Sequence, residues 1–215
     1  VLLHENPGPA HVKQNWKRTD VGGGLSVNKI EDAVFADLNE DGQIDAVVTA
    51  TENRSEKVGL HWLIDSDAPH ATSSWQGEWL DQRLRFLFVK VSVGQIDGKG
   101  ALDIAVGSKS DSKPARLVWY RAPENPGPAN TGDWRGQDIA DIEWTDTLQV
   151  IDVNADGRND LLLNHTNHLA WYENPGKLEQ DDRLWTEHVI SDSTGPYLAM
   201  CGRPSALRMV VGADI

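Results

Sequence analysis

Two related acidic loops occur in this chain: Asp37-Leu-Asn-Glu-Asp-Gly-Gln-Ile-Asp45 and Asp152-Val-Asn-Ala-Asp-Gly-Arg-Asn-Asp160. Ca²⁺ requires oxygen ligands at alternate positions of a tight loop, and glycine at the sixth position permits the sharp turn. The pattern therefore predicts two Ca²⁺ sites. The expected ligands are Asp37, Asn39, Asp41, Asp45 and the Gln43 carbonyl in the first, and Asp152, Asn154, Asp156, Asp160 and the Arg158 carbonyl in the second.

A metal-free interpretation of these loops is also open. Asp and Asn side chains accept hydrogen bonds from their own backbone in Asx turns, which need no ion. An EF-hand is disfavoured, because the glutamate at the twelfth position is absent and strand-forming residues such as Ala46-Val-Val-Thr49 follow in place of a helix.

Composition indicates an all-β fold in a single domain covering residues 1–215. The chain has nine Trp, 19 Gly and 10 Pro, and it lacks a long helical period of apolar residues. The net charge of −13, without a Lys/Arg cluster, disfavours nucleic acid and anionic membranes as partners. No apolar run is long enough to insert into a membrane, and the lone Cys201 excludes an internal disulfide.

A third, altered loop lies between the two acidic ones, at Gln95-Ile-Asp-Gly-Lys-Gly-Ala-Leu-Asp103. The ninth-position residues Asp45, Asp103 and Asp160 are 58 and 57 residues apart, which indicates a structural repeat. In this third loop Gln95 and Lys99 replace two acidic ligands, and the ammonium of Lys99 opposes a cation. We therefore expect Ca²⁺ in two loops only.

A second signature follows each of the later loops. Trp119-Tyr120 precedes Glu124-Asn-Pro-Gly127, and Trp171-Tyr172 runs directly into Glu173-Asn-Pro-Gly176. Each unit is thus predicted to have four strands, which lie before the loop, after it, at the Trp-Tyr pair and after the Asn-Pro-Gly turn. The aromatic pairs are expected to pack between units, and stacking on sugar rings is the alternative.

Repeated four-stranded units predict a β-propeller. Its blades are expected at about residues 25–84, 85–142 and 143–193, with a fourth blade split between 194–215 and 1–24. Pairing of the N-terminal with the C-terminal strands would close a ring of four blades and remove its open edges. The alternative is a fragment of a larger propeller.

The loops and units together resemble the FG-GAP or VCBS repeat family, the calcium-loop propellers that include the integrin α-subunit head. The resemblance covers nearly all of the chain and is closest at residues 37–45 and 152–160. It implies that the ions hold the hairpins together and take no part in catalysis. High Ca²⁺ concentrations outside the cytoplasm suit such loops, so we expect an exported protein.

A ligand is expected on the face opposite the ions, where the remaining loops gather. The candidate residues there are Glu52, Asn53, Asn164, His165 and His168. The two histidines could hold a transition metal, but a three-residue spacing on a hairpin turn is poor evidence for one, and solvent-exposed histidines are the preferred interpretation. The leading hypothesis is a non-enzymatic, lectin-like module that binds a glycan or protein. The alternatives are the propeller of a carbohydrate-active lyase or dehydratase, and a structural or oligomerisation unit.

Overall fold

The structure is a computed structural model, and it describes residues 2–20, 27–52, 58–64, 76–82, 87–109, 114–165, 168–176, 185–192, 197–203 and 206–213. Regular structure within these ranges is strand, apart from the short 3-10 helix η1 (Pro128–Asp133). The expected all-β class is therefore confirmed. None of the described residues forms a helix long and apolar enough to cross a membrane.

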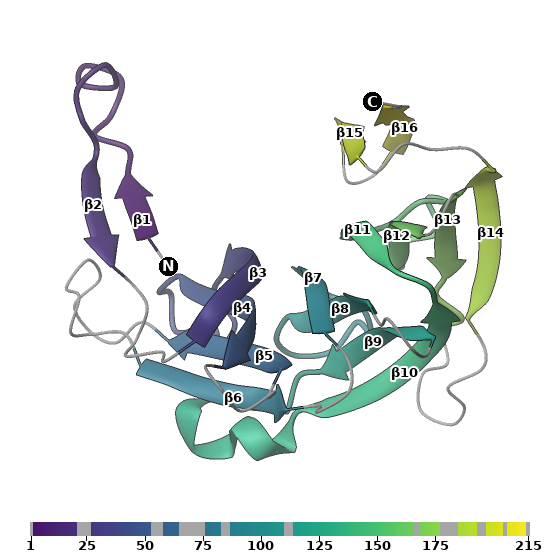
Figure 1. Ribbon diagram of the computed structural model, residues 1–215, viewed down its shortest axis with the longest axis horizontal. Coiled ribbons are helices and arrows are strands. Elements are labelled where there is room, and N and C mark those ends of the chain that lie inside the picture. The colour runs from purple at the N-terminus through teal and green to yellow at the C-terminus, as the bar shows by residue number, and fades with distance from the viewer. Residues whose placement is uncertain are drawn as a thin grey trace.

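Three four-stranded antiparallel sheets succeed one another along the chain, each built from consecutive strands (Figure 1). The first contains β3 (Val27–Ala36), β4 (Asp45–Glu52), β5 (Val58–Ile64) and β6 (Gln76–Gln82). The second contains β7 (Leu87–Gly94), β8 (Asp103–Lys109), β9 (Ala115–Arg121) and β10 (Arg135–Ile142). The third contains β11 (Thr145–Ile151), β12 (Asp160–His165), β13 (His168–Glu173) and β14 (Thr186–Ser191).

The sheets pack face to face, and alternation along each strand divides its side chains between two cores. In β8, Ile104 and Val106 pack in the core shared with the first sheet, whereas Ala105 packs in the core shared with the third. β12 is buried at every position, and its apolar residues Leu161, Leu162 and Leu163 lie between the polar residues Asp160, Asn164 and His165. The outer strand β14 is mostly exposed.

Most of the repeated aromatic residues lie between sheets, which confirms the packing interpretation for them. Trp119, Tyr120 and Tyr172 are buried, and Tyr120 belongs to the first core while the other two belong to the second. Trp171 points to the other side of β13, where its ring stacks on His188 at 4.4 Å between centroids. Burial of these aromatic rings therefore stabilises the packing of the sheets.

The first strands of the sheets contact one another through polar groups as well as apolar ones. The backbone N–H of Val91 in β7 donates to Asp32 of β3 at 3.2 Å. One sheet further on, the N–H of Val150 in β11 donates to the Ser92 hydroxyl of β7 at 3.1 Å. These side chains satisfy partly buried backbone N–H groups of β7 and β11.

Close approach of the second and third sheets depends on Gly107. A Cβ at this position would lie 2.1 Å from Cγ2 of Thr145 in β11. We expect Gly107→Ala to lower the free energy of unfolding by about 1–3 kcal/mol through overpacking, measured by urea denaturation. Adding Thr145→Ser removes the clashing methyl and keeps the hydroxyl, so it should recover part of the loss. No recovery would mean that this contact does not limit the packing.

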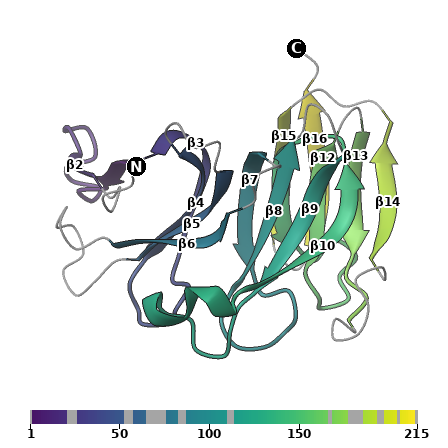
Figure 2. The same cartoon turned by 60° about the horizontal axis from the view of Figure 1, so that its bottom comes forward.

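The two ends of the chain form separate hairpins. Strands β1 (Leu2–Glu5) and β2 (Lys17–Asp20) pair with each other, as do β15 (Tyr197–Arg203) and β16 (Ala206–Ala213). Figures 1 and 2 show them at the two ends of an open arc of sheets. The expected pairing between the terminal strands is absent from the described strands, so the structure does not show a closed ring. Among the described strands, each terminal hairpin pairs only within itself.

Candidate functional site

The two acidic loops connect the first two strands of the first and third sheets, β3–β4 and β11–β12. In the first, Asp37 accepts hydrogen bonds from the N–H groups of Asp41 (3.1 Å) and Gly42 (2.9 Å). In the second, Asp152 accepts from those of Asp156 (3.1 Å) and Gly157 (2.9 Å). Two distant segments therefore have the same loop conformation.

Both loops need left-handed backbone at two places. Gly42 and Gly157 have φ of 86° and 87°, as the sixth-position glycine predicted. The fourth positions, Glu40 and Ala155, are also left-handed at 60° and 62°, although neither is glycine. Such a conformation is costly for residues with a side chain, so the loop contacts must hold it in place.

The third and fifth ligand positions lie together in each loop. Asn39 donates to Asp41 at 2.8 Å, and Asn154 donates to Asp156 at 3.1 Å. Oδ1 of Asn39 and of Asn154 accepts from the backbone N–H of Asp41 (3.3 Å) and of Asp156 (3.1 Å), which are the Asx contacts of the metal-free interpretation. Such side-chain oxygens are also the ligands that Ca²⁺ prefers. Asp156 also pairs with the guanidinium of Arg158. Its pKa is lowered, chiefly by the hydrogen bond from the Arg158 backbone N–H.

The ninth-position aspartates are buried and anchor each loop to its sheet. Asp160 accepts from the N–H groups of Val153 (3.0 Å) and Asn174 (2.9 Å), and Asp45 accepts from that of Leu38 (3.3 Å). Burial raises the pKa of Asp160, and the charges of Asp156 and Asp152 add to this effect. A cation bound in the loop would offset this crowding of carboxylates.

The altered loop of the second sheet has a side-chain amide at its centre. Nε2 of Gln95 donates to the carbonyls of Lys99 (3.2 Å), Gly100 (2.8 Å) and Ala101 (3.1 Å). Ala101 is the seventh position, whose carbonyl was expected to face an ion in the acidic loops. A partly positive NH₂ group thus lies where those loops would place a cation. The donor sets of loops 37–45 and 152–160 fit Ca²⁺, and that of loop 95–103 does not.

Calcium stoichiometry tests this distinction between the loops. We expect calorimetric titration to give two equivalents of Ca²⁺ for the unaltered chain and one for either Asp41→Ala or Asp156→Ala, because each change removes a carboxylate ligand. The matched control is Lys99→Ala at the same position of the altered loop, which should keep two equivalents. Two equivalents in the aspartate variants would contradict the assignment.

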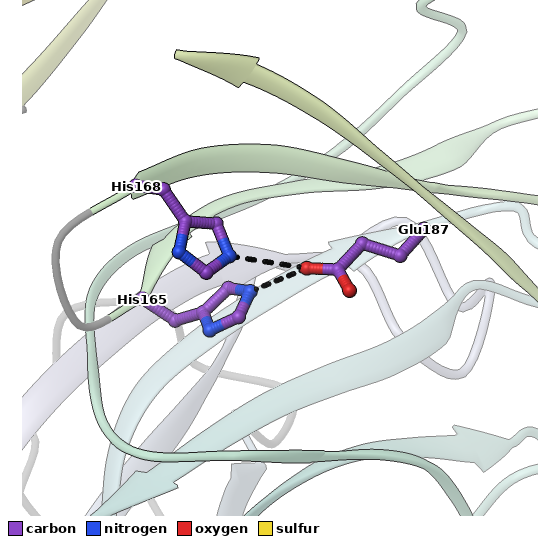
Figure 3. Close-up of side chains that lie close together, drawn as sticks. All are labelled: His165, His168 and Glu187. Atoms are coloured by element: carbon purple, nitrogen blue, oxygen red, sulfur yellow. Dashed lines mark hydrogen bonds and ion pairs between the residues drawn. The ribbon is translucent and has the colours of Figure 1, made fainter. Parts of the chain in front are cut away.

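At the opposite end of the third sheet, side chains from three adjacent strands converge (Figure 3). His165 ends β12 and His168 begins β13, and the two face each other across the hairpin. Glu187 of β14 places Oε1 at 2.9 Å from Nε2 of His165 and 3.2 Å from Nε2 of His168. The imidazole rings lie 4.1 Å apart, and the Tyr172 hydroxyl is 3.5 Å from His165.

Burial distinguishes the members of this cluster. The side chain of His165 is 8% exposed, so the expectation of a solvent-exposed histidine is wrong there, because Tyr172 and Glu187 cover the ring. His168 and Glu187 are 29% and 39% exposed. Burial lowers the pKa of His165. Burial acts to raise the pKa of Glu187, but hydrogen bonds from His168 and His165 outweigh it and leave that pKa lowered.

Asn164, another predicted ligand residue, does not join this cluster. Asn164 points to the opposite side of β12, where its oxygen accepts from the Asp146 N–H (3.2 Å) and the Thr147 hydroxyl (2.9 Å). Glu52 is the last residue of β4, and Asn53 lies outside the described residues. Sequence reasoning missed Glu187, which is distant in sequence and has no motif around it.

A second histidine–carboxylate pair lies on the other face of the same strands. His188 Nε2 is 2.8 Å from Oε2 of Glu173, whose Oε1 is 3.5 Å from Asn154 of the acidic loop. The ring of His188 is covered by Trp171. This pair lacks a second imidazole, so its donor set is poorer than that of the His165, His168 and Glu187 cluster.

Comparison with known protein families finds no family that matches this chain, and comparison with curated proteins finds no match either.

Proposed function

We propose that this chain is a non-enzymatic binding module stabilised by two Ca²⁺ ions, and that the face opposite the ions recognises a glycan or a protein. One observation supports it most directly. Two acidic loops share one hydrogen-bond pattern around clustered side-chain oxygens, whereas the related loop has the Gln95 amide at its centre. Ca²⁺ ions in the acidic loops would stabilise the hairpins that these loops connect. The stabilised sheets would then present the loops of the opposite face to a ligand.

The proposal includes membership of the FG-GAP or VCBS propeller class and an exported location, where Ca²⁺ is abundant. In this architecture the three four-stranded sheets are blades. Pairing of β16 with β1 would complete a fourth, and the alternative is an arc that belongs to a larger propeller. Nuclear Overhauser contacts between β16 and β1 in solution distinguish the closed ring from the arc.

The proposed ligand face lies at the turn between the second and third strands of each sheet. In the third sheet this end contains His165 and His168, whereas the acidic loop is at the other end of β12. A ligand bound there would leave the ions untouched. The net charge of −13 favours a neutral or basic ligand over a nucleic acid.

Glycan-array binding in saturating Ca²⁺ tests this function. We expect binding without turnover, lost in His168→Ala and retained in Asp41→Ala, because the first change is on the ligand face and the second affects one ion. Binding that survives His168→Ala but disappears in Asp41→Ala would place the ligand at the ion loops and overturn the assignment of faces.

One observation favours a second candidate, the propeller of a carbohydrate-active lyase or dehydratase. His165 and the Tyr172 hydroxyl lie 3.5 Å apart beside Glu187, which is a set able to move protons. Turnover of a sugar substrate that is lost on replacing His165 or His168 would support this enzyme and exclude the non-enzymatic module.

A further inference from the structure

We propose that His165, His168 and Glu187 form a binding site for a divalent transition metal of the zinc type. This site lies at the opposite end of the third sheet from the acidic loop and is distinct from the two calcium loops. It does not depend on the proposed function, since it needs neither Ca²⁺ nor a glycan.

The positions of the donor atoms support this inference. Each residue offers one ligand atom, and the three atoms lie within 4.8 Å of one another. The two nitrogen-to-oxygen separations are 2.9 Å and 3.2 Å. Tetrahedral zinc with bonds of about 2.1 Å holds its ligand atoms about 3.4 Å apart. The two nitrogen-to-oxygen separations are therefore a few tenths of an ångström short of that spacing.

Without metal, hydrogen bonds already draw both histidines to one carboxylate oxygen. Both imidazoles direct Nε2 at the same carboxylate oxygen while their rings are 4.1 Å apart (Figure 3). Two hydrogen bonds require a proton on Nε2 of each ring, and both protons must share Oε1. One divalent ion in place of the two protons would satisfy both nitrogens and the oxygen together.

The site is built on regular, paired strands, and it is accessible. The histidines flank one hairpin turn, and Glu187 lies on the next strand, so three hydrogen-bonded strands fix the ligands. The partial exposure of His168 and Glu187 provides entry for the ion. Three protein ligands leave a fourth position of tetrahedral zinc for water or an added ligand.

The ligand types select the metal. Imidazole nitrogen suits zinc, nickel, cobalt and copper, whereas Ca²⁺ and Mg²⁺ prefer oxygen alone. The acidic loops have the opposite preference. The same sheet would thus hold a hard ion at one end and a borderline ion at the other.

The site is tested by titration with Zn²⁺ and with Co²⁺. Bound metals are first removed from the protein with a chelator, and the titrations are done in excess Ca²⁺. We expect one equivalent of Zn²⁺, and visible absorption of Co²⁺ that indicates nitrogen and oxygen coordination. His168→Ala and Glu187→Gln should weaken Zn²⁺ binding by more than the roughly 10- to 100-fold that follows loss of an outer partner. Calcium stoichiometry measured on the same samples keeps this test separate from the proposed function.

The matched control is His188→Ala, which removes the histidine of the pair with Glu173 on the same strands and should leave Zn²⁺ affinity unchanged. Near-ultraviolet circular dichroism identifies variants that remain folded. If Glu187→Gln fails to fold, His168→Ala decides the question, because the His168 side chain is partly exposed. Absence of Zn²⁺ binding by the unaltered chain, or equal affinity in all folded variants, would overturn the proposal.

Discussion

Saturating Ca²⁺ is expected to raise the melting temperature of this chain by roughly 5 to 10 °C for each occupied loop. An ion at about 100 times its dissociation constant stabilises the folded state by about 2.7 kcal/mol. For a chain of this size, each kcal/mol corresponds to about 2–4 °C. The physical reason is that Asp37, Asp41, Asp152 and Asp156 are concentrated in two short loops, where an ion offsets their mutual repulsion. Calorimetric melting with Ca²⁺ and with chelator measures the shift.

The double variant Asp41→Ala/Asp156→Ala provides the control for this prediction. It should melt at nearly the same temperature with and without Ca²⁺, while each single variant keeps about half of the shift. A calcium-dependent shift that persists in the double variant would locate the stabilising ions elsewhere and remove the main support for the proposed function.

The second large effect is expected for Asn174→Ala in the Glu-Asn-Pro-Gly turn after β13. Asn174 is fully buried, and its Nδ2 donates to the carbonyls of Ile96 (2.8 Å) and Asn159 (2.9 Å). Its side chain therefore joins the acidic loop of the third sheet to the altered loop of the second. Unsatisfied buried groups cost about 1–3 kcal/mol each, so the free energy of unfolding should fall by about 3 kcal/mol. Urea denaturation measures this loss.

Asn125 is the matched control for Asn174. It occupies the same place in the preceding Glu124-Asn-Pro-Gly127 turn, but its side chain is exposed. Asn125→Ala should change stability by less than about 0.5 kcal/mol, as surface substitutions usually do. Equal effects of the two variants would show that the motif acts through its local turn and not through the contact between sheets.

The acidic loops could be predicted from sequence because their geometry is local. The spacing of carboxylates and the sixth-position glycine determine a turn within nine residues, and the observed turns occur at those positions. The sheet order also follows from local signals, since consecutive strands joined by short turns pair with their neighbours. The repetition of the Trp-Tyr pair in successive units was sufficient to predict that Trp119 and Tyr120 pack between sheets.

Several features depended on contacts between distant residues and could not be predicted. The convergence of Glu187 on His165 depends on two strand registers together, that of β12 with β13 and that of β13 with β14. The β13–β14 register also shifts between Leu169 and Ala170. In the sequence, Gln95 stands only as the replacement of an acidic calcium ligand. In the folded loop its amide donates to three backbone carbonyls. Pairing of the terminal hairpins was expected from their complementary strand patterns, and it stays a prediction because the described strands do not show it.

The local spacing of glycine, aspartate and apolar residues was enough to predict where the chain turns and which segments are strands, and the repeated Trp-Tyr pairs indicated aromatic packing between sheets. Only the tertiary structure decided which polar side chains meet. Asn174 reaches Ile96, and His165 reaches Glu187, because strand register and sheet packing set distances that no local pattern encodes.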